Sequence, residues 1–227
     1  MRIRTFRRRS TPGLALEAPE RNPASWETRE DLAEMGKPMS RIHMIRHGRP
    51  ASTWGDADQD PGLDAVGAEQ ARAVASVLLA LPENERPSRV VSSPLRRCRE
   101  TAQPLADALG LVVEIDPRVG EIPTPAALDA EARPGWLREA FQGRWSDIRG
   151  DLDYAAWTRE VAEGVASHPR AAVFSHFVAL NAAVSVATGG EVVAAFRPDH
   201  VSVTTFDLVD GALILVDKGR EASTEVL

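Results

Sequence analysis

Short apolar runs alternate with longer segments of helical periodicity along the chain from residue 41 onward. Such runs are typical of strands buried on both faces of a sheet, and intervening helices connect strands that lie parallel. A final pair of apolar runs flanks Asp210-Gly211, a dipeptide that favours a tight turn between antiparallel strands. The pattern predicts an α/β fold: a three-layer α/β/α sandwich around a mostly parallel mixed sheet.

The runs predict individual elements. Strands are expected at 41–45, 89–91, 111–115, 171–175, 201–208 and 212–216. Helices are expected at 65–81, 94–109, 135–142, 152–167 and 177–188. Asp64 is expected to cap the first helix, whose apolar side would carry Val66, Val74, Val77, Leu78 and Leu81. Ser93 is expected to cap the second, which Gly110 would end.

Composition and charge exclude several classes of protein. Of the 227 residues, 43% are hydrophobic, which is enough for a sizeable core. The formal net charge of -6 argues against a nucleic-acid partner. No apolar run approaches the ~20 residues that span a membrane, so no membrane partner is expected. The single cysteine, Cys98, falls on an apolar helical position, which fits a buried thiol in a cytoplasmic protein.

Two stretches differ from the regular pattern. Residues 1–38 begin with an arginine-rich run and show no sustained periodicity, so we expect a disordered or loosely ordered extension before a folded domain at 39–227. Residues 118–150 are interrupted by prolines and carry several aromatic side chains. We interpret them as a lid over a site, with a packed connection as the alternative.

The first expected strand ends in Arg46-His47-Gly48, and Pro50 prevents it from continuing. Ligands of open α/β sheets bind beyond the carboxyl ends of the strands. Imidazole can act as a nucleophile, guanidinium groups bind phosphate oxygens, and glycine allows the backbone to approach closely. Alone the tripeptide is weak evidence, because a histidine at a strand end is more often structural.

Two further strand ends bring related chemistry to the same edge. The second strand runs into Ser93-Pro94-Leu95-Arg96-Arg97, where a helix N-terminus favours anions. Arg97 lies one turn into that helix and can fold back toward a phosphate, whereas Arg96 and Arg99 are expected to be solvated. The fourth strand ends in Ser175-His176. These strand ends together predict a phosphate pocket.

In combination these stretches resemble the histidine phosphatase superfamily, the phosphoglycerate mutase-like family, over about residues 41–216. The matching stretches are Arg46-His47-Gly48, Leu63 to Ala71, Ser93 to Arg97 with Thr101-Ala102, and Ser175-His176. The resemblance implies a phosphoglycerate mutase-like fold, with residues 39–227 as the catalytic domain. It also implies phosphoryl chemistry on a small phosphorylated substrate.

The resemblance also implies roles for individual residues. His47 would be phosphorylated during turnover, and the phosphoryl group would be bound by Arg46, Arg97 and His176. Glu121 matches the place of the general acid. Physical chemistry is consistent with these roles, since two guanidinium groups offset a phosphate dianion and keep a neighbouring imidazole neutral. None of these steps requires a metal or another cofactor.

Other titratable residues are less informative. Glu131 and Glu139 are the next candidates for the acid if Glu121 is not. The remaining histidines show no spacing typical of metal ligands and are expected to be structural, with a place at the pocket rim as the alternative for His200. These histidines are His43, His168 and His200.

The chain departs from the family pattern at three places. Arg49 stands where the family often has an acidic residue, and Phe177-Val178 stand where glycines are common. Residues 122–125 differ from the glycine-rich segment typical of the mutases. These departures leave the substrate open.

Three functional interpretations remain at this point. The first is a metal-independent phosphatase that hydrolyses small phosphomonoesters through a phosphohistidine. The second is a phosphoglycerate mutase-type phosphotransferase or a phosphoprotein phosphatase. The third, from another class, is a catalytically silent phosphate-binding module. The oligomeric state is open, a homodimer being one possibility.

Overall fold

The computed structural model describes residues 40–52, 58, 60–129 and 131–223. Six strands form one sheet in the order β3-β2-β4-β1-β5-β6. The pairs β3–β2, β2–β4 and β4–β1 are parallel, and β5 and β6 continue the sheet in antiparallel pairing. The strands are β1 (Ser40–Arg46), β2 (Arg89–Ser92), β3 (Val113–Ile115), β4 (Ala171–Ser175), β5 (Val203–Val209) and β6 (Ala212–Asp217).

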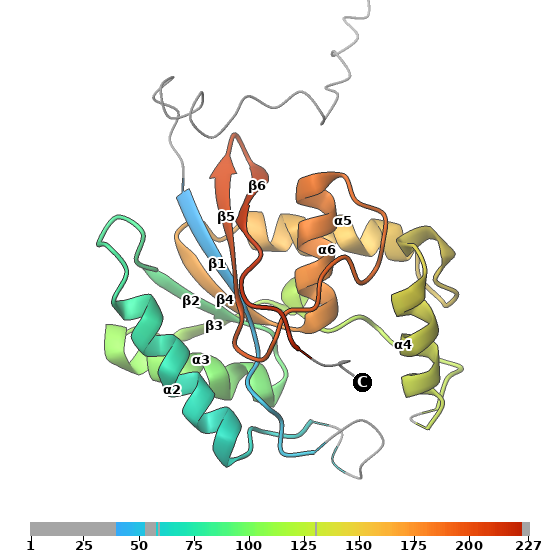
Figure 1. Cartoon of the computed structure of the whole chain (residues 1–227), viewed down its shortest axis with the longest axis horizontal. Coiled ribbons are helices and arrows are strands. Elements are labelled where there is room, and N and C mark those ends of the chain that lie inside the picture. Colours follow the sequence, from blue (N-terminus) through green and yellow to red (C-terminus); the bar gives the residue numbers. More distant parts are fainter. Residues whose placement is uncertain (1–39, 53–57, 59, 130, 224–227) are drawn as a thin grey trace, which may run out of the picture.

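Helices cover both faces of this sheet. Figure 1 shows α2 and α3 side by side on one face, with α5 and α6 on the other. A separate apolar cluster fills the space under each helix pair. The predicted three-layer α/β/α sandwich is therefore confirmed. The α-helices are α2 (Ala65–Leu79), α3 (Arg96–Leu109), α4 (Arg133–Gln142), α5 (Tyr154–Ala166) and α6 (Phe177–Thr188).

The register of the central strands brings three strand ends together. The last residue of β1, Arg46, lies opposite Ser175 at the end of β4. The last residue of β2, Ser92, lies opposite Phe174 of the same strand. Because all three strands are parallel, the residues that follow them meet at one edge of the sheet.

The two antiparallel strands, β5 and β6, lie at one side of the sheet, next to β1. β5 and β6 are joined by Asp210 and Gly211, whose φ angles of 49° and 83° are both positive. Positive φ at both central residues is the requirement of a type I′ turn, which Asp-Gly satisfies readily. The predicted hairpin is confirmed.

The start of α3 differs from the prediction. The helix begins at Arg96 after an N-cap at Leu95, and no side chain caps it. The prediction that Ser93 caps this helix is therefore wrong. The Ser93 hydroxyl lies instead 2.8 Å from Nε2 of His176 and accepts the Leu95 N–H at 3.3 Å. This serine is directed toward a neighbouring strand end, and that orientation is incompatible with the expected cap.

The other predicted helix boundaries are closer to the structure. Asp64 caps α2 by accepting the N–H of Gly67 at 2.7 Å, and Gly110 ends α3 with a φ of 66°. Val74 and Leu78 are buried as expected, whereas Val66 and Val77 are exposed, so the expected place of these two on the buried side of α2 is wrong. The other buried residues of α2 are small, namely Gly67, Ala71 and Ala75, and α2 packs against α3.

Residues 118–150 contain α4 and a short 3-10 helix, Trp145–Asp147. Trp145 is buried, donates its Nε1–H to Ser185 Oγ at 2.9 Å, and packs 6.0 Å from the ring of Trp157. Phe141 packs 5.2 Å from the ring of Phe177. These contacts hold the second half of the segment against α5 and α6. A function as a lid stays a prediction.

The expected N-terminal extension, residues 1–38, lies outside the described residues. Among the helices that are described, none has the length and apolar character needed to cross a membrane.

Candidate active site

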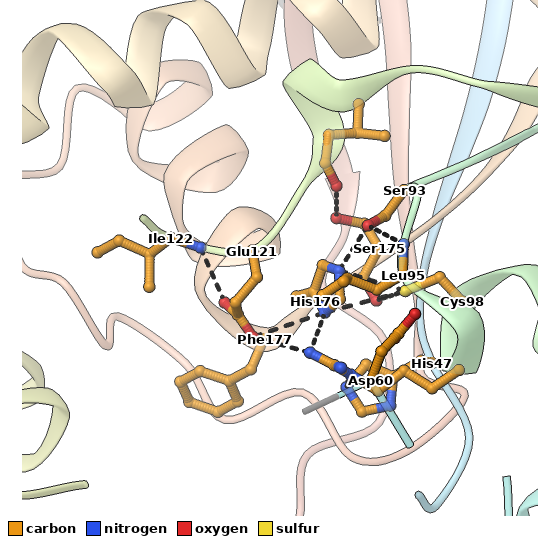
Figure 2. Close-up of polar contacts among 12 residues, drawn as sticks. His47, Asp60, Ser93, Leu95, Cys98, Glu121, Ile122, Ser175, His176 and Phe177 are labelled. Atoms are coloured by element: carbon orange, nitrogen blue, oxygen red, sulfur yellow. Dashed lines mark hydrogen bonds and ion pairs between the residues drawn. The ribbon is translucent and has the colours of Figure 1, made fainter. Parts of the chain in front are cut away.

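Three strand ends form the candidate active site. His47 follows β1, Ser93 follows β2 and His176 follows β4. Figure 2 shows these side chains gathered around one point, together with Glu121 from the loop after β3. We call the group formed by Arg46, His47, Arg97 and His176 the strand-end pocket.

His47 is almost fully buried and has a defined partner at each ring nitrogen. Its Nδ1 lies 2.8 Å from the Gly48 carbonyl oxygen, and its Nε2 accepts Nε–H of Arg97 at 3.3 Å. Burial, followed by the positive charges of Arg97 and Arg46, lowers the pKa of His47 well below its usual value. The imidazole is therefore neutral at pH 7, with an unprotonated nitrogen available as a nucleophile.

The backbone after His47 is fixed by close packing against two helices. The Gly48 N–H donates to Thr101 Oγ1 at 3.0 Å, and that hydroxyl donates to the Arg97 carbonyl at 2.6 Å. A Cβ at Gly48 would lie 2.8 Å from the carbonyl oxygen of Gly67, so a larger residue would force α2 away. The glycine of the Arg-His-Gly motif is thus required by the approach of α2.

Arg46 is a second buried cation near His47. Its Nη1 donates to the Pro198 carbonyl at 2.9 Å, and its guanidinium lies 5.5 Å from the centre of the Phe177 ring. Burial lowers the pKa of Arg46 to about 10, an effect that the charges of Glu121 and Asp199 oppose. The group remains positively charged at pH 7.

Arg97 connects the two histidines. It is the second residue of α3, closer to the helix start than the expected full turn, and it is buried. Besides donating to His47, it places Nη2 3.2 Å from Nδ1 of His176. His176 is fully buried, and burial followed by the charge of Arg97 lowers the pKa of His176 well below its usual value.

Glu121 reaches the strand-end pocket from the segment after β3. Its Oε2 lies 3.5 Å from Nδ1 of His176 and 3.7 Å from Nη2 of Arg97. Its other oxygen accepts the Ile122 N–H at 3.0 Å, which orients the carboxylate (Figure 2). The two other acidic candidates of this segment, Glu131 and Glu139, are exposed. The structure therefore brings the five sequence-derived site residues together.

Sequence analysis missed Arg133, which comes from α4. Its side chain is half-buried and donates Nη2–H to the Ile122 carbonyl at 3.5 Å. Burial lowers the pKa of Arg133, while the charge of Glu121 opposes that effect. This arginine therefore adds a cation beside the carboxylate. No motif marks it, because its position depends on how the irregular segment folds.

His200 lies at the rim of the pocket. The centre of its ring is 6.0 Å from that of His47, and the preceding Pro198 carbonyl binds Arg46. Burial, followed by the charge of Arg46, lowers the pKa of His200 to about 4. The structure thus supports the rim position that the sequence left as the alternative. In the sequence, Pro198-Asp199 was the signal for a loop before His200, because both residue types favour turns.

The other two histidines have structural surroundings. His43 is buried, with Nε2 3.1 Å from the Glu85 carbonyl oxygen. His168 lies with Nε2 2.7 Å from Oδ2 of Asp116. Although burial opposes the effect, hydrogen bonds from Arg118 and His168 lower the pKa of Asp116 to about 2. These contacts tie the chain together away from the strand-end pocket.

The expectations for Arg96, Arg99 and Cys98 are met. Arg96 and Arg99 are exposed, and Arg49 is exposed with its Nε 2.6 Å from Asp64 Oδ2. Cys98 is fully buried, and burial raises the pKa of its thiol. In the described part of the chain, no group of three or more His, Cys, Asp or Glu residues could hold a metal ion.

This combination of groups suits a dianionic phosphoryl group. Two buried guanidinium groups supply fixed positive charge close to a neutral imidazole. The fold and site define an α/β protein with a buried cluster of arginine and histidine side chains at the carboxyl ends of its parallel strands, where such proteins bind ligands. Residues 42–219 match the model of the histidine phosphatase superfamily (branch 1), and the chain belongs to that family. The family predicted from the motifs is therefore confirmed.

The chain is also similar in sequence to a named protein. The chain is 37% identical over 142 residues to glucosyl-3-phosphoglycerate phosphatase of Mycobacterium tuberculosis. That alignment covers 57% of this chain and 62% of the relative, so the chain matches somewhat less than two thirds of that protein's length.

Solved structures share the fold. A structure of mycobacterial glucosyl-3-phosphoglycerate phosphatase with VO3 is 28% identical, with a TM-score of 0.57 over 81% of this chain and 100% of the other. A phosphoserine phosphatase of Entamoeba histolytica in complex with 3-phosphoglyceric acid has a TM-score of 0.60 at 19% identity. The match covers 81% of this chain and 98% of that structure, and at this identity it shows only that the two folds are alike.

Proposed function

We propose that the protein is a metal-independent phosphatase that hydrolyses small phosphomonoesters through a phosphohistidine at His47. The observation that carries this proposal is the placement of a neutral imidazole in contact with the Arg97 guanidinium and near that of Arg46, both buried at the strand ends. Such a group can attack phosphorus while the cations offset the charge that would otherwise repel it.

The first step transfers the phosphoryl group to the enzyme. Nε2 of His47 attacks phosphorus in line with the ester oxygen, and the N–P bond forms as the P–O bond breaks. Arg46 and Arg97 bind the equatorial oxygens. The Arg97 Nε–H, which Nε2 of His47 accepts in the free enzyme, turns to one of these oxygens and leaves the Nε2 lone pair free to attack. Glu121, in its protonated form, gives its proton to the departing alkoxide, so the products are an alcohol and phosphohistidine.

The second step returns the enzyme to its starting state. Glu121, now ionised, accepts a proton from a water molecule as the water oxygen attacks phosphorus. The N–P bond breaks, inorganic phosphate leaves, and His47 regains its unprotonated nitrogen. The chain's own arginines supply the positive charge, so the scheme includes no metal ion.

The relatives support this assignment and suggest a substrate. The mycobacterial relative is named for a sugar-linked phosphoglycerate, and its solved forms include complexes with VO3 and with inorganic phosphate. We therefore propose a small phosphomonoester as the substrate and a phosphorylated glycerate derivative as the first class to test. A cytoplasmic location stays a prediction, which subcellular fractionation would test.

The experiment is a phosphatase screen on the purified full chain, with and without a chelator. We expect release of inorganic phosphate, unchanged by chelator and inhibited by orthovanadate, which mimics the five-coordinate transferring phosphoryl group. Activity that disappears with chelator and returns with a divalent metal would contradict the proposal. Transfer of phosphate between positions of a phosphoglycerate without its release would favour a mutase.

A further inference from the structure

Ser93 contacts the ring nitrogen of His176 that Arg97 does not contact. Its Oγ lies 2.8 Å from Nε2, and Figure 2 shows the two side chains directed toward each other. Both side chains are fully buried. The other neighbour of this nitrogen is the Cys98 thiol, at 3.4 Å. A thiol is a weak hydrogen-bonding group, so the serine hydroxyl is the stronger partner of the two.

Hydrogen-bond polarity determines which nitrogen of His176 carries the proton. A guanidinium group only donates, so the 3.2 Å contact between Arg97 Nη2 and His176 Nδ1 is a hydrogen bond only if Nδ1 is unprotonated. The Glu121 carboxylate oxygen, 3.5 Å from the same nitrogen, lies beyond the usual N–H···O distance and is the weaker partner of Nδ1. A neutral ring then carries its proton on Nε2. That proton is donated to Ser93 Oγ, whose two lone pairs can accept it together with the Leu95 N–H.

The same polarity continues through Arg97 to the nucleophile. Arg97 donates its Nε–H to Nε2 of His47, which must therefore be unprotonated. The proton of His47 is then on Nδ1, which donates to the Gly48 carbonyl at 2.8 Å. Ser93, His176, Arg97 and His47 thus form one row in which each hydrogen bond has a defined direction.

We propose that Ser93 is a positioning residue: by accepting Nε2–H of His176, it keeps Nδ1 available to hold the Arg97 guanidinium against His47. The inference rests on the proposed function, in which Arg97 binds the phosphoryl group. It also gives His176 a role in the free enzyme that differs from the phosphoryl binding implied by the family resemblance. His176 accepts a hydrogen bond from Arg97 there, and it would need the other tautomer to donate to a phosphoryl oxygen.

Nitrogen-15 NMR of the full chain labelled at histidine tests the tautomers directly. With resonances assigned from single histidine variants, we expect His176 protonated on Nε2 and His47 protonated on Nδ1. Ser93→Ala should give a mixture of His176 tautomers, whereas Ser93→Thr, which keeps the hydroxyl, should retain the original one. Ser92→Ala is the matched control, because the Ser92 hydroxyl donates to the Ser93 carbonyl.

Kinetics supply a second readout. Ser93→Ala should lower kcat/KM and weaken orthovanadate binding by about ten-fold, the size expected for one buried hydrogen bond, with recovery in Ser93→Thr. A wild-type His176 protonated on Nδ1 would overturn the proposal, and so would a Ser93→Ala variant that keeps the Nε2–H tautomer. If the wild type neither hydrolyses phosphomonoesters nor binds vanadate, the proposed function fails, while the tautomer pattern still decides the role of Ser93.

Discussion

The strand-end pocket and residues 118–150 both contribute to the site, but they are built differently. Arg46, His47, Arg97 and His176 are buried and linked by the sheet register and by direct hydrogen bonds. The segment 118–150 is irregular and contributes Glu121 through a single backbone contact and two longer ion pairs.

The difference separates two parts of the proposed reaction. The strand-end pocket surrounds the phosphoryl group, which every phosphomonoester shares. The segment 118–150 brings Glu121 and Arg133, which would face the group that leaves. We therefore expect changes in the pocket to impair all substrates alike, and changes in the segment to depend on the leaving group.

Arg97→Met should produce the largest effect among these changes. Removing a guanidinium that stabilises a transferring phosphoryl group typically reduces the rate on the order of 10³–10⁵-fold. The loss should be similar for an alkyl phosphate and a nitrophenyl phosphate, as measured by steady-state kcat/KM. Exposed Arg99→Met is the control on the same helix. A loss confined to one of the two esters would contradict the division between the regions.

Glu121→Gln should have a smaller effect that depends on the substrate. For an alkyl phosphate, whose leaving alkoxide needs a proton, phosphohistidine formation should slow on the order of 10²–10⁴-fold. A nitrophenyl phosphate releases a stable phenolate and should be affected much less. Rapid-quench measurement of the first step compares the two, with Glu139→Gln as the control. Equal losses for both esters would mean that Glu121 is not the acid.

The pH dependence should follow the state of His47. Because burial and the neighbouring arginines lower its pKa, the neutral form persists below pH 6.5, and kcat/KM should begin to fall only below that value. The free energy of unfolding should also decrease as the pH falls below 6.5, because the unfolded chain takes up a proton on His47 there and the folded protein does not. NMR titration should show a higher pKa for His47 in Arg97→Met. A lower or unchanged pKa would show that Arg97 does not lower the pKa of His47.

Thr101→Val should have the smallest effect of the series. It removes the hydroxyl that accepts the Gly48 N–H, leaving a buried donor without its partner. The free energy of unfolding should fall by about 1–3 kcal/mol, as measured by urea denaturation. Thr158→Val is the matched control, because that buried hydroxyl only donates to a carbonyl of its own helix. An equal loss of free energy of unfolding in both variants would show that the hydrogen bond from Gly48 to Thr101 contributes no extra stability.

The same comparison explains what the sequence could predict. The strand-end pocket lies on regular elements, so apolar runs and helix periodicity locate Arg46, Arg97 and His176 at one edge. Glu121 required the family resemblance, because no periodicity determines the path of residues 118–150. Arg133 was missed for that reason.

Errors in the prediction came from competition between local and tertiary contacts. Ser93 has the sequence context of a helix cap, yet its hydroxyl lies against His176, because a buried histidine nitrogen needs a partner. Phe177 was noted only as a departure from the family. Its ring beneath Arg46 depends on the first turn of α6 meeting the end of β1, which no local pattern shows.

The central claim is that His47 carries the phosphoryl group during turnover. Protein mixed with a phosphomonoester radiolabelled in its phosphate and quenched within a turnover tests this directly, with His168→Asn as a control histidine away from the strand-end pocket. We expect covalent label that is stable to alkali and labile to acid, present in the wild type and in His168→Asn, and absent from His47→Ala. Label that persists in His47→Ala, or activity in that variant near the wild-type level, would contradict the account.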